Sequence, residues 1–177
     1  RAPTTPTHFA VFTGTIYVFG QGNYRSRLLK LHDPEHNVHV VGKCLKSDSE
    51  YLVNRRYCQR LRKRFDAYRD FPWHDSRYGL VPGGRQPMSY RLAETILANI
   101  IPVIIIPDDA LLPPKIPWEL ISYRFSPDQE EEIIPFLRSV SDNEYYTMRQ
   151  RLSEWEKDMT AESIFEKALR ANHFDVR

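Results

Sequence analysis

The chain has 177 residues, of which 41% are hydrophobic and 27% are charged, and its formal net charge is +2. This length and composition predict one globular domain with a single sizeable core. No apolar run approaches the roughly 18 residues that cross a bilayer, so we expect no membrane contact from this stretch. The opening "RAPTTPTH" is typical of a linker, and we expect a fragment of a longer protein.

Short apolar runs alternate with helical patterns along the first part of the chain. The spacing of Leu28, Leu29 and Leu31 predicts a helix in "YRSRLLKLH", and a second helix is predicted from about Met88 to Ala98. Strands are predicted at residues 8–14, 38–42, 78–81 and 102–106. Continuous apolar strands that alternate with helices indicate a mostly parallel sheet covered on both faces, the doubly wound α/β class.

The last third of the chain is predicted to be helical after the proline-rich loop "PDDALLPPKIPW". Ser126 and Gln129 are typical of a helix start with Pro127 in the first turn, and Pro135 is expected to interrupt that helix. A second capping box begins the next helix, whose buried face is predicted to carry Tyr145, Met148, Leu152 and Trp155. A final amphipathic helix is predicted in "TAESIFEKALRA".

Positive charge is concentrated in the first part of the chain. Residues 1–126 carry 18 Lys and Arg against 11 Asp and Glu, whereas residues 127–177 carry 7 against 12. The densest stretch, residues 54–69, would spread its charges around much of a helix, which argues against a nucleic-acid partner. We interpret it as a solvated face, with contact to an acidic glycan or phosphate as the alternative.

The loop after the predicted strand at 78–81 combines features of an anion site. Open parallel sheets bind ligands beyond the carboxyl ends of their strands, where Gly83 and Gly84 let the backbone come close. The following helix offers free N–H groups, to which Ser89 can add a hydroxyl and Arg85 and Arg91 planar donor forks. Leu92, Ala93, Ile96 and Leu97 are predicted to face the sheet, which leaves Glu94 on the same side as Arg91, where it can accept ribose hydroxyls. The alternative is that Arg91 and Glu94 form an ordinary surface ion pair.

One stretch of the sequence resembles a known family. "LVPGGRQPMSYRLAETILANIIPVII", followed by "LPPKIPWE", closely resembles the C-terminal half of the exostosin domain of family 47 glycosyltransferases. Arg25 and Leu28 also fall where these enzymes keep an arginine and a leucine after an "F-x-G" strand, here Phe12 to Gly14, and "LRSVSDNEYYTMRQRL" is similar to their closing helices. The resemblance covers residues 9–159, so 1–8 are predicted to be a linker and 160–177 a C-terminal helix.

The resemblance implies the donor-binding half of an inverting, nucleotide-sugar-dependent enzyme with two Rossmann-like halves, the GT-B architecture. Arg25 and Arg91 correspond to the phosphate-facing arginines, Glu94 to the ribose-binding carboxylate and Ser89 to the serine at the helix start. Arg85 matches the first of two neighbouring arginines, and Gln86 replaces the second, which leaves the donor open. The implied donor-binding residues are Gly14, Arg25, Arg85, Ser89, Arg91 and Glu94.

The implied chemistry stabilises negative charge on the departing diphosphate with arginines and helix N–H groups, so no metal is obligatory. No Asp-x-Asp motif is present, since Asp108 and Asp109 are adjacent. His32, His36 and His39 lie close together in sequence, but Pro34 breaks a helix there and we expect a solvated loop rather than a zinc site. The catalytic base is expected on the acceptor-binding half, outside this chain.

Partners and compartment follow from the same resemblance. A UDP-sugar donor, a glycan acceptor, and the N-terminal acceptor-binding half or a partner transferase are expected. From composition alone, Cys44 and Cys58 could pair or stay free, but they fall where animal members place cysteines, which implies a disulfide and a secretory (Golgi or ER) lumen within a longer membrane-anchored protein. A cytoplasmic location stays open.

Two other hypotheses for the function remain. A catalytically silent exostosin-like domain would act as a scaffold or bind an acidic glycan. An unrelated dinucleotide enzyme is disfavoured because Gly20 and Gly22 lack the third glycine of G-x-G-x-x-G.

Overall fold

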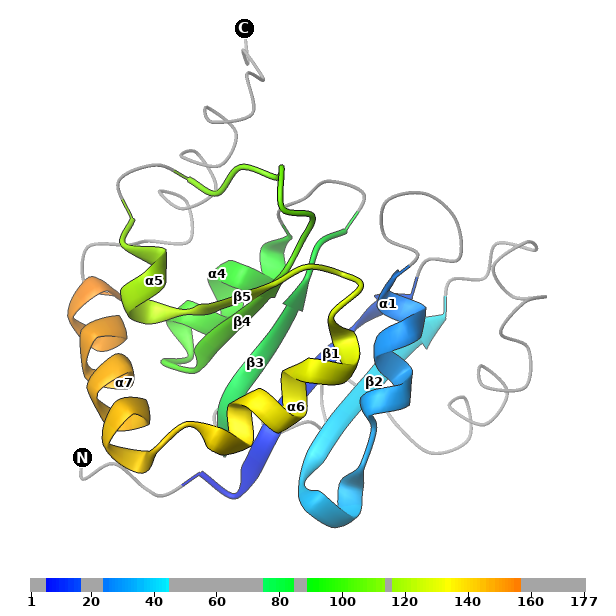
Figure 1. Cartoon of the computed structure of the whole chain (residues 1–177), viewed down its shortest axis with the longest axis horizontal. Coiled ribbons are helices and arrows are strands. Elements are labelled where there is room, and N and C mark those ends of the chain that lie inside the picture. The colour runs from blue at the N-terminus through cyan, green and yellow to red at the C-terminus, as the bar shows by residue number, and fades with distance from the viewer. Residues whose placement is uncertain (1–5, 17–23, 45–74, 85–88, 114–115, 157–177) are drawn as a thin grey trace, which may run out of the picture.

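The computed structural model describes residues 6–16, 24–44, 75–84, 89–113 and 116–156. Its centre is a five-stranded sheet with the strand order β2-β1-β3-β4-β5, and every neighbouring pair is parallel (Figure 1). The strands are β1 His8–Ile16, β2 Val38–Cys44, β3 Ser76–Pro82, β4 Ile101–Ile105 and β5 Tyr123–Phe125. The predicted α/β, Rossmann-like class is therefore confirmed.

Helices connect the strands along the described ranges. After β1 come α1 Tyr24–Arg27 and the 3-10 turns η1 Leu28–Leu31 and η2 Pro34–His36; after β3 comes α4 Tyr90–Leu97; after β4 comes α5 Trp118–Ile121; after β5 come α6 Glu130–Ser139 and α7 Asp142–Glu156. The basic stretch 54–69, Cys58 and the predicted helix at 160–171 lie outside the described residues.

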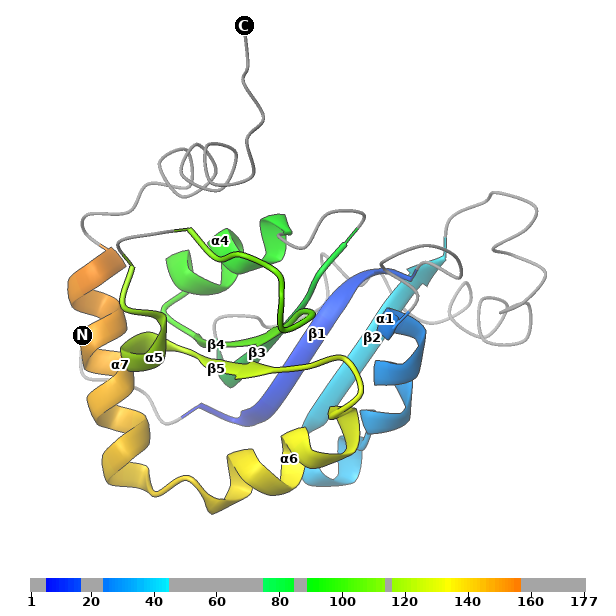
Figure 2. The ribbon, with the colours of Figure 1, turned by 45° about the horizontal axis from the view of Figure 1, so that its top comes forward.

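Two apolar clusters hold the layers together, one on each face of the sheet. The first packs η1, α6 and the start of α7 against alternate strand residues such as Phe12, Tyr78 and Val103. The second packs α4, α5 and the end of α7 against residues such as Val81 and Ile104. Figure 2 accordingly has α4 and α6 on opposite sides of the sheet. Because both faces are covered, all five β4 residues are buried, which explains their continuous apolar run.

The chain winds in two directions from the centre of the sheet. The connection after β1 leads to β2 on one side, whereas β3 leads to β4 and β5 on the other. Neighbours β1 and β3 pair at His8–Ser76, Ala10–Tyr78 and Val11–Gly79 and, within the described residues, at no later position. We call the carboxyl halves that do not pair with each other, residues 12–16 of β1 and 80–82 of β3, the β1–β3 fork. It is the topological switch point of the sheet.

Two helix predictions were wrong in detail. The predicted pairing of Ser126 with Gln129 forms, since the Gln129 side chain accepts the Ser126 N–H at 2.8 Å. The helix α6 nevertheless begins at Glu130 rather than at Pro127, because residues 126–129 form a turn. It also continues through Pro135. The proline removes a bond to the carbonyl of Glu131, which lies on an exposed side of the helix, while the buried Ile133 and Leu137 anchor the turns around it.

The inner face of α4 also differs from the prediction. Leu92 and Ile96 are buried as expected, but Leu97 is 43% exposed and Thr95 is fully buried in its place. The predicted stripe on α7 is confirmed: Tyr145, Met148 and Leu152 are buried, Trp155 packs against the second cluster, and the Ser141 hydroxyl accepts the Glu144 N–H at 3.2 Å.

Thr95 is buried because it fits against a glycine. A Cβ at Gly79 would lie 2.5 Å from the Thr95 Cγ2 methyl, far inside van der Waals contact, so only glycine lets α4 sit this close to β3. The Thr95 hydroxyl in turn donates to the Arg91 carbonyl at 2.6 Å. The contact between Gly79 and Thr95 therefore fixes how deeply α4 packs on the sheet.

We predict that Gly79→Ala lowers the free energy of unfolding by about 1–3 kcal/mol, because the new methyl overpacks the interface between β3 and α4. Adding Thr95→Ala should relieve the clash, so the double variant should be less destabilised than the sum of the single variants in urea denaturation. A Gly79→Ala protein as stable as the wild type would contradict this packing.

Candidate functional site

The β1–β3 fork is closed by one side chain, Arg25 of α1. Its Nη1 donates to the Thr15 carbonyl at 3.0 Å on β1. On the other strand, Nη2 donates to the Pro82 carbonyl at 3.1 Å and Nε to the Gly83 carbonyl at 2.7 Å. Arg25 is only 6% exposed. The planar guanidinium thus connects β1 and β3 by hydrogen bonds at the end where the two strands do not pair with each other.

Gly14 helps to position the residues that bridge the fork. A Cβ at Gly14 would meet the Phe12 ring at 2.9 Å, so the glycine leaves room for that ring to lie over the strand. The Arg25 guanidinium sits 5.8 Å from the centre of the same ring, within cation–π range. The structure therefore gives Gly14 a part in seating Phe12 and Arg25.

The start of α4 lies beyond the carboxyl end of β3. Ser89 has extended backbone angles, φ −131° and ψ 153°, at the N-cap position, but its hydroxyl makes no capping bond. The Ser89 Oγ is buried and, within the described part of the chain, has no hydrogen-bond partner. A buried hydroxyl without a partner is uncommon in folded proteins, so it is a candidate donor for a ligand at this helix start.

Arg91 and Glu94 form the ion pair that was the alternative to a ligand-binding role. The Arg91 Nη1 lies 2.6 Å from the Glu94 Oε2, with the Arg91 side chain 10% exposed and the Glu94 side chain 52% exposed. Burial of the arginine distinguishes this pair from an ordinary surface pair, since the guanidinium is held against the fold. The half-exposed carboxylate of Glu94 keeps access to solvent.

Gly83 and Gly84 join the fork to the loop that leads to α4, and both are buried. The Gly83 N–H donates to the Ile105 carbonyl at 3.1 Å, while its carbonyl accepts from Arg25. The predicted site residue Arg85 lies outside the described residues, as does Cys58, the predicted partner of Cys44. Of the six predicted donor-binding residues, Gly14 and Arg25 meet at the fork, and Ser89, Arg91 and Glu94 share the start of α4.

A second arginine at this edge was not predicted. Arg124 of β5 donates through Nη2 to three carbonyls of the turn after β4, those of Pro107, Asp108 and Ala110, at 2.9, 2.9 and 3.0 Å. No residue pattern predicts this role, because backbone acceptors are not visible in a sequence. Arg124 holds the turn that carries the exposed Asp108 and Asp109.

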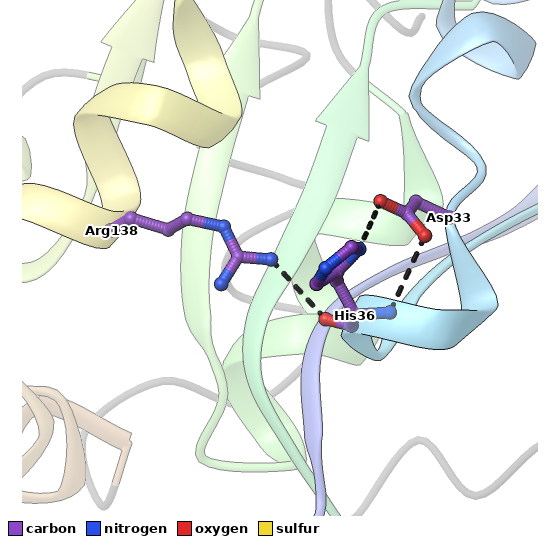
Figure 3. Close-up of polar contacts among 3 residues, drawn as sticks. All are labelled: Asp33, His36 and Arg138. Carbon is purple, nitrogen blue, oxygen red and sulfur yellow. Dashed lines mark hydrogen bonds and ion pairs between the residues drawn. The ribbon is translucent and has the colours of Figure 1, made fainter.

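The four histidines in the described part of the chain lie at the opposite, amino-terminal edge of the sheet and divide into two groups. His36 pairs through Nδ1 with Asp33 at 2.6 Å and its carbonyl accepts from Arg138 at 3.3 Å (Figure 3). His39 instead stacks edge-on with His8 at 4.7 Å and lies 6.2 Å from His32. Among the described residues, no three His, Cys, Asp or Glu side chains form a group that could hold a metal ion.

Burial lowers the pKa of His39, and the nearby His8 and His32 lower it further. The His32 Nδ1 accepts the Val40 N–H at 3.1 Å, which requires that nitrogen to be unprotonated. The surroundings therefore favour the neutral form of His39 in the folded protein.

Comparisons with known proteins do not assign the chain: no protein-family model and no curated protein matches it. Along the described ranges, no helix has both the length and the apolar character needed to cross a bilayer.

We predict that Arg25→Met lowers the free energy of unfolding by roughly 3–5 kcal/mol, because three carbonyls each lose a charged donor. Arg25→Lys should recover only part of this, since one ammonium cannot span both strands. Arg124→Met is the matched control: it also removes an arginine that holds three carbonyls, but at an exposed site, and should lower the free energy by about 1 kcal/mol. Equal losses in urea denaturation would contradict a special role for the fork.

The free energy of unfolding should fall as the pH drops below about 6.5, the ordinary pKa of a histidine. Below that pH the unfolded chain binds a proton at His39, whereas the folded chain, in which this pKa is lowered, binds it less readily. His39→Gln removes that proton and should flatten the dependence of the unfolding free energy on pH between 7 and 5. An unchanged slope in the variant would contradict this assignment.

Proposed function

We propose that this chain is the donor-binding half of an inverting glycosyltransferase, which takes a sugar from a nucleotide-sugar, a UDP-sugar by the resemblance, and gives it to a glycan acceptor. The observation that supports this best is the β1–β3 fork. It lies at the topological switch point, where open α/β sheets bind their ligands, and Arg25 places a buried positive charge there. Gly83 and Gly84 then lead from the fork toward α4.

The start of α4 supplies the groups that a nucleoside diphosphate requires. Arg91 and the Ser89 hydroxyl can donate to diphosphate oxygens, and the positive end of the helix dipole favours the anion. Glu94 can accept the ribose hydroxyls, and its ion pair with Arg91 holds both side chains in place before a ligand arrives. Because negative charge grows on the diphosphate as the glycosidic bond breaks, such fixed donors stabilise the transition state more than the ground state.

Arg25 has a different part in this proposal from the one that the resemblance implies. Its three nitrogens already donate to carbonyls of β1 and β3, so we assign it as a positioning residue. It holds the ends of the two strands and adds positive charge behind the site, while Arg91 faces the diphosphate.

The remaining parts of the proposal rest on the resemblance. The acceptor-binding half would supply the base that takes the proton from the acceptor hydroxyl. A disulfide between Cys44 and Cys58 would fit an oxidising lumen, that of the Golgi or the ER.

We predict that Arg91→Ala and Glu94→Ala each weaken UDP binding by about ten- to a hundredfold in calorimetric titration, since a charged contact contributes roughly 1.5–3 kcal/mol. Arg151→Ala is the matched control, because Arg151 is exposed on α7, and it should leave the affinity unchanged. Thermal unfolding of each variant tests that the fold is kept.

Unchanged UDP affinity in both site variants would contradict the assignment of the site. Binding of UDP without transfer of sugar from any UDP-sugar, when the chain is combined with its acceptor-binding half, would favour a silent scaffold domain.

A further inference from the structure

The start of α4 carries an exposed aromatic side chain that the proposed site has not used. Tyr90 is the first residue of α4, directly after Ser89, and is 69% exposed. Single exposed apolar residues are normal on protein surfaces, so exposure alone assigns nothing. The position of Tyr90 beside the groups of the proposed site makes it a candidate for ligand contact.

The helical period places Tyr90 next to Glu94. Residues four apart on a helix are neighbours on one side, so Tyr90 lies one turn before Glu94 and nearer to the carboxyl edge of the sheet. Glu94 pairs in turn with Arg91, three residues before it. The opposite side of α4, with Leu92 and Ile96, is buried against the second apolar cluster. Tyr90, Glu94 and Arg91 thus form one continuous set at the start of the helix.

The order of these side chains matches the order of groups in a nucleotide. Arg91 is suited to phosphate oxygens and Glu94 to ribose hydroxyls, and the base is joined directly to the ribose. A flat aromatic ring next to the ribose-binding carboxylate is the group that would cover the face of a base.

We infer that the Tyr90 ring stacks on the nucleobase of the bound nucleotide, an assignment that rests on the proposed function. Stacking is tolerant of base identity, because every base presents a π-face. Tyr90 therefore contributes affinity for any nucleoside diphosphate and does not choose between bases. It makes no contribution to ligands that have phosphate but no base.

The test compares UDP, GDP and inorganic pyrophosphate by calorimetric titration against the wild-type chain, Tyr90→Ala and Tyr90→Phe. We expect Tyr90→Ala to weaken UDP and GDP by about ten- to a hundredfold and to leave pyrophosphate unchanged. Tyr90→Phe keeps the ring and should bind nearly as the wild type does. Leu97→Ala is the control, because Leu97 is exposed at the far end of the same helix and should have no effect.

The outcomes separate this inference from the proposed function. If UDP binds the wild type and weakens in Arg91→Ala but not in Tyr90→Ala, the stacking assignment is overturned and the proposed site stands. Equal weakening of pyrophosphate and UDP in Tyr90→Ala also overturns it, since the ring would then act through the phosphate site. If the wild type binds neither UDP nor GDP, both proposals fail together.

Discussion

The Arg25 guanidinium across the β1–β3 fork is the interaction on which the rest of the carboxyl edge depends. In a doubly wound sheet, two neighbouring strands separate where the connections leave in opposite directions. Carbonyl groups at the separated ends then lose their hydrogen-bond donors on the neighbouring strand. The planar Arg25 cation, with its three donating nitrogens, supplies hydrogen bonds to the carbonyls of Thr15, Pro82 and Gly83. A neutral side chain could offer fewer donors in that geometry, which explains why a charge is buried there.

Two small residues let this arrangement form. Gly14 admits the Phe12 ring beneath Arg25, and Gly79 admits Thr95 of α4 against β3. The first contact seats the guanidinium and the second sets the position of the helix that carries Arg91 and Glu94. The elements around the proposed site are therefore fixed by packing in the core, so the groups assigned to ligand binding lie on rigid elements.

Much of this could be predicted from the sequence, because strand runs, helical periods and the spacing of Arg91 and Glu94 are local signals. The structure confirms the parallel sheet, the α7 face and that ion pair. Other features depend on tertiary contacts. Thr95 is buried in place of Leu97 because a glycine lies opposite it, α6 passes through Pro135 because buried residues flank it, and the roles of Arg25 and Arg124 depend on carbonyls of other segments.

The most direct test of the account is the place where a nucleoside diphosphate binds. We would follow the backbone amide signals of the isotope-labelled 20.9 kDa chain during titration with UDP by NMR. The account predicts saturable shifts at the carboxyl edge, at Gly83, Gly84 and residues 89–91, with little change around His39 at the amino edge. Shifts confined to the amino edge, or no shifts at millimolar UDP, would contradict a nucleotide site at the fork.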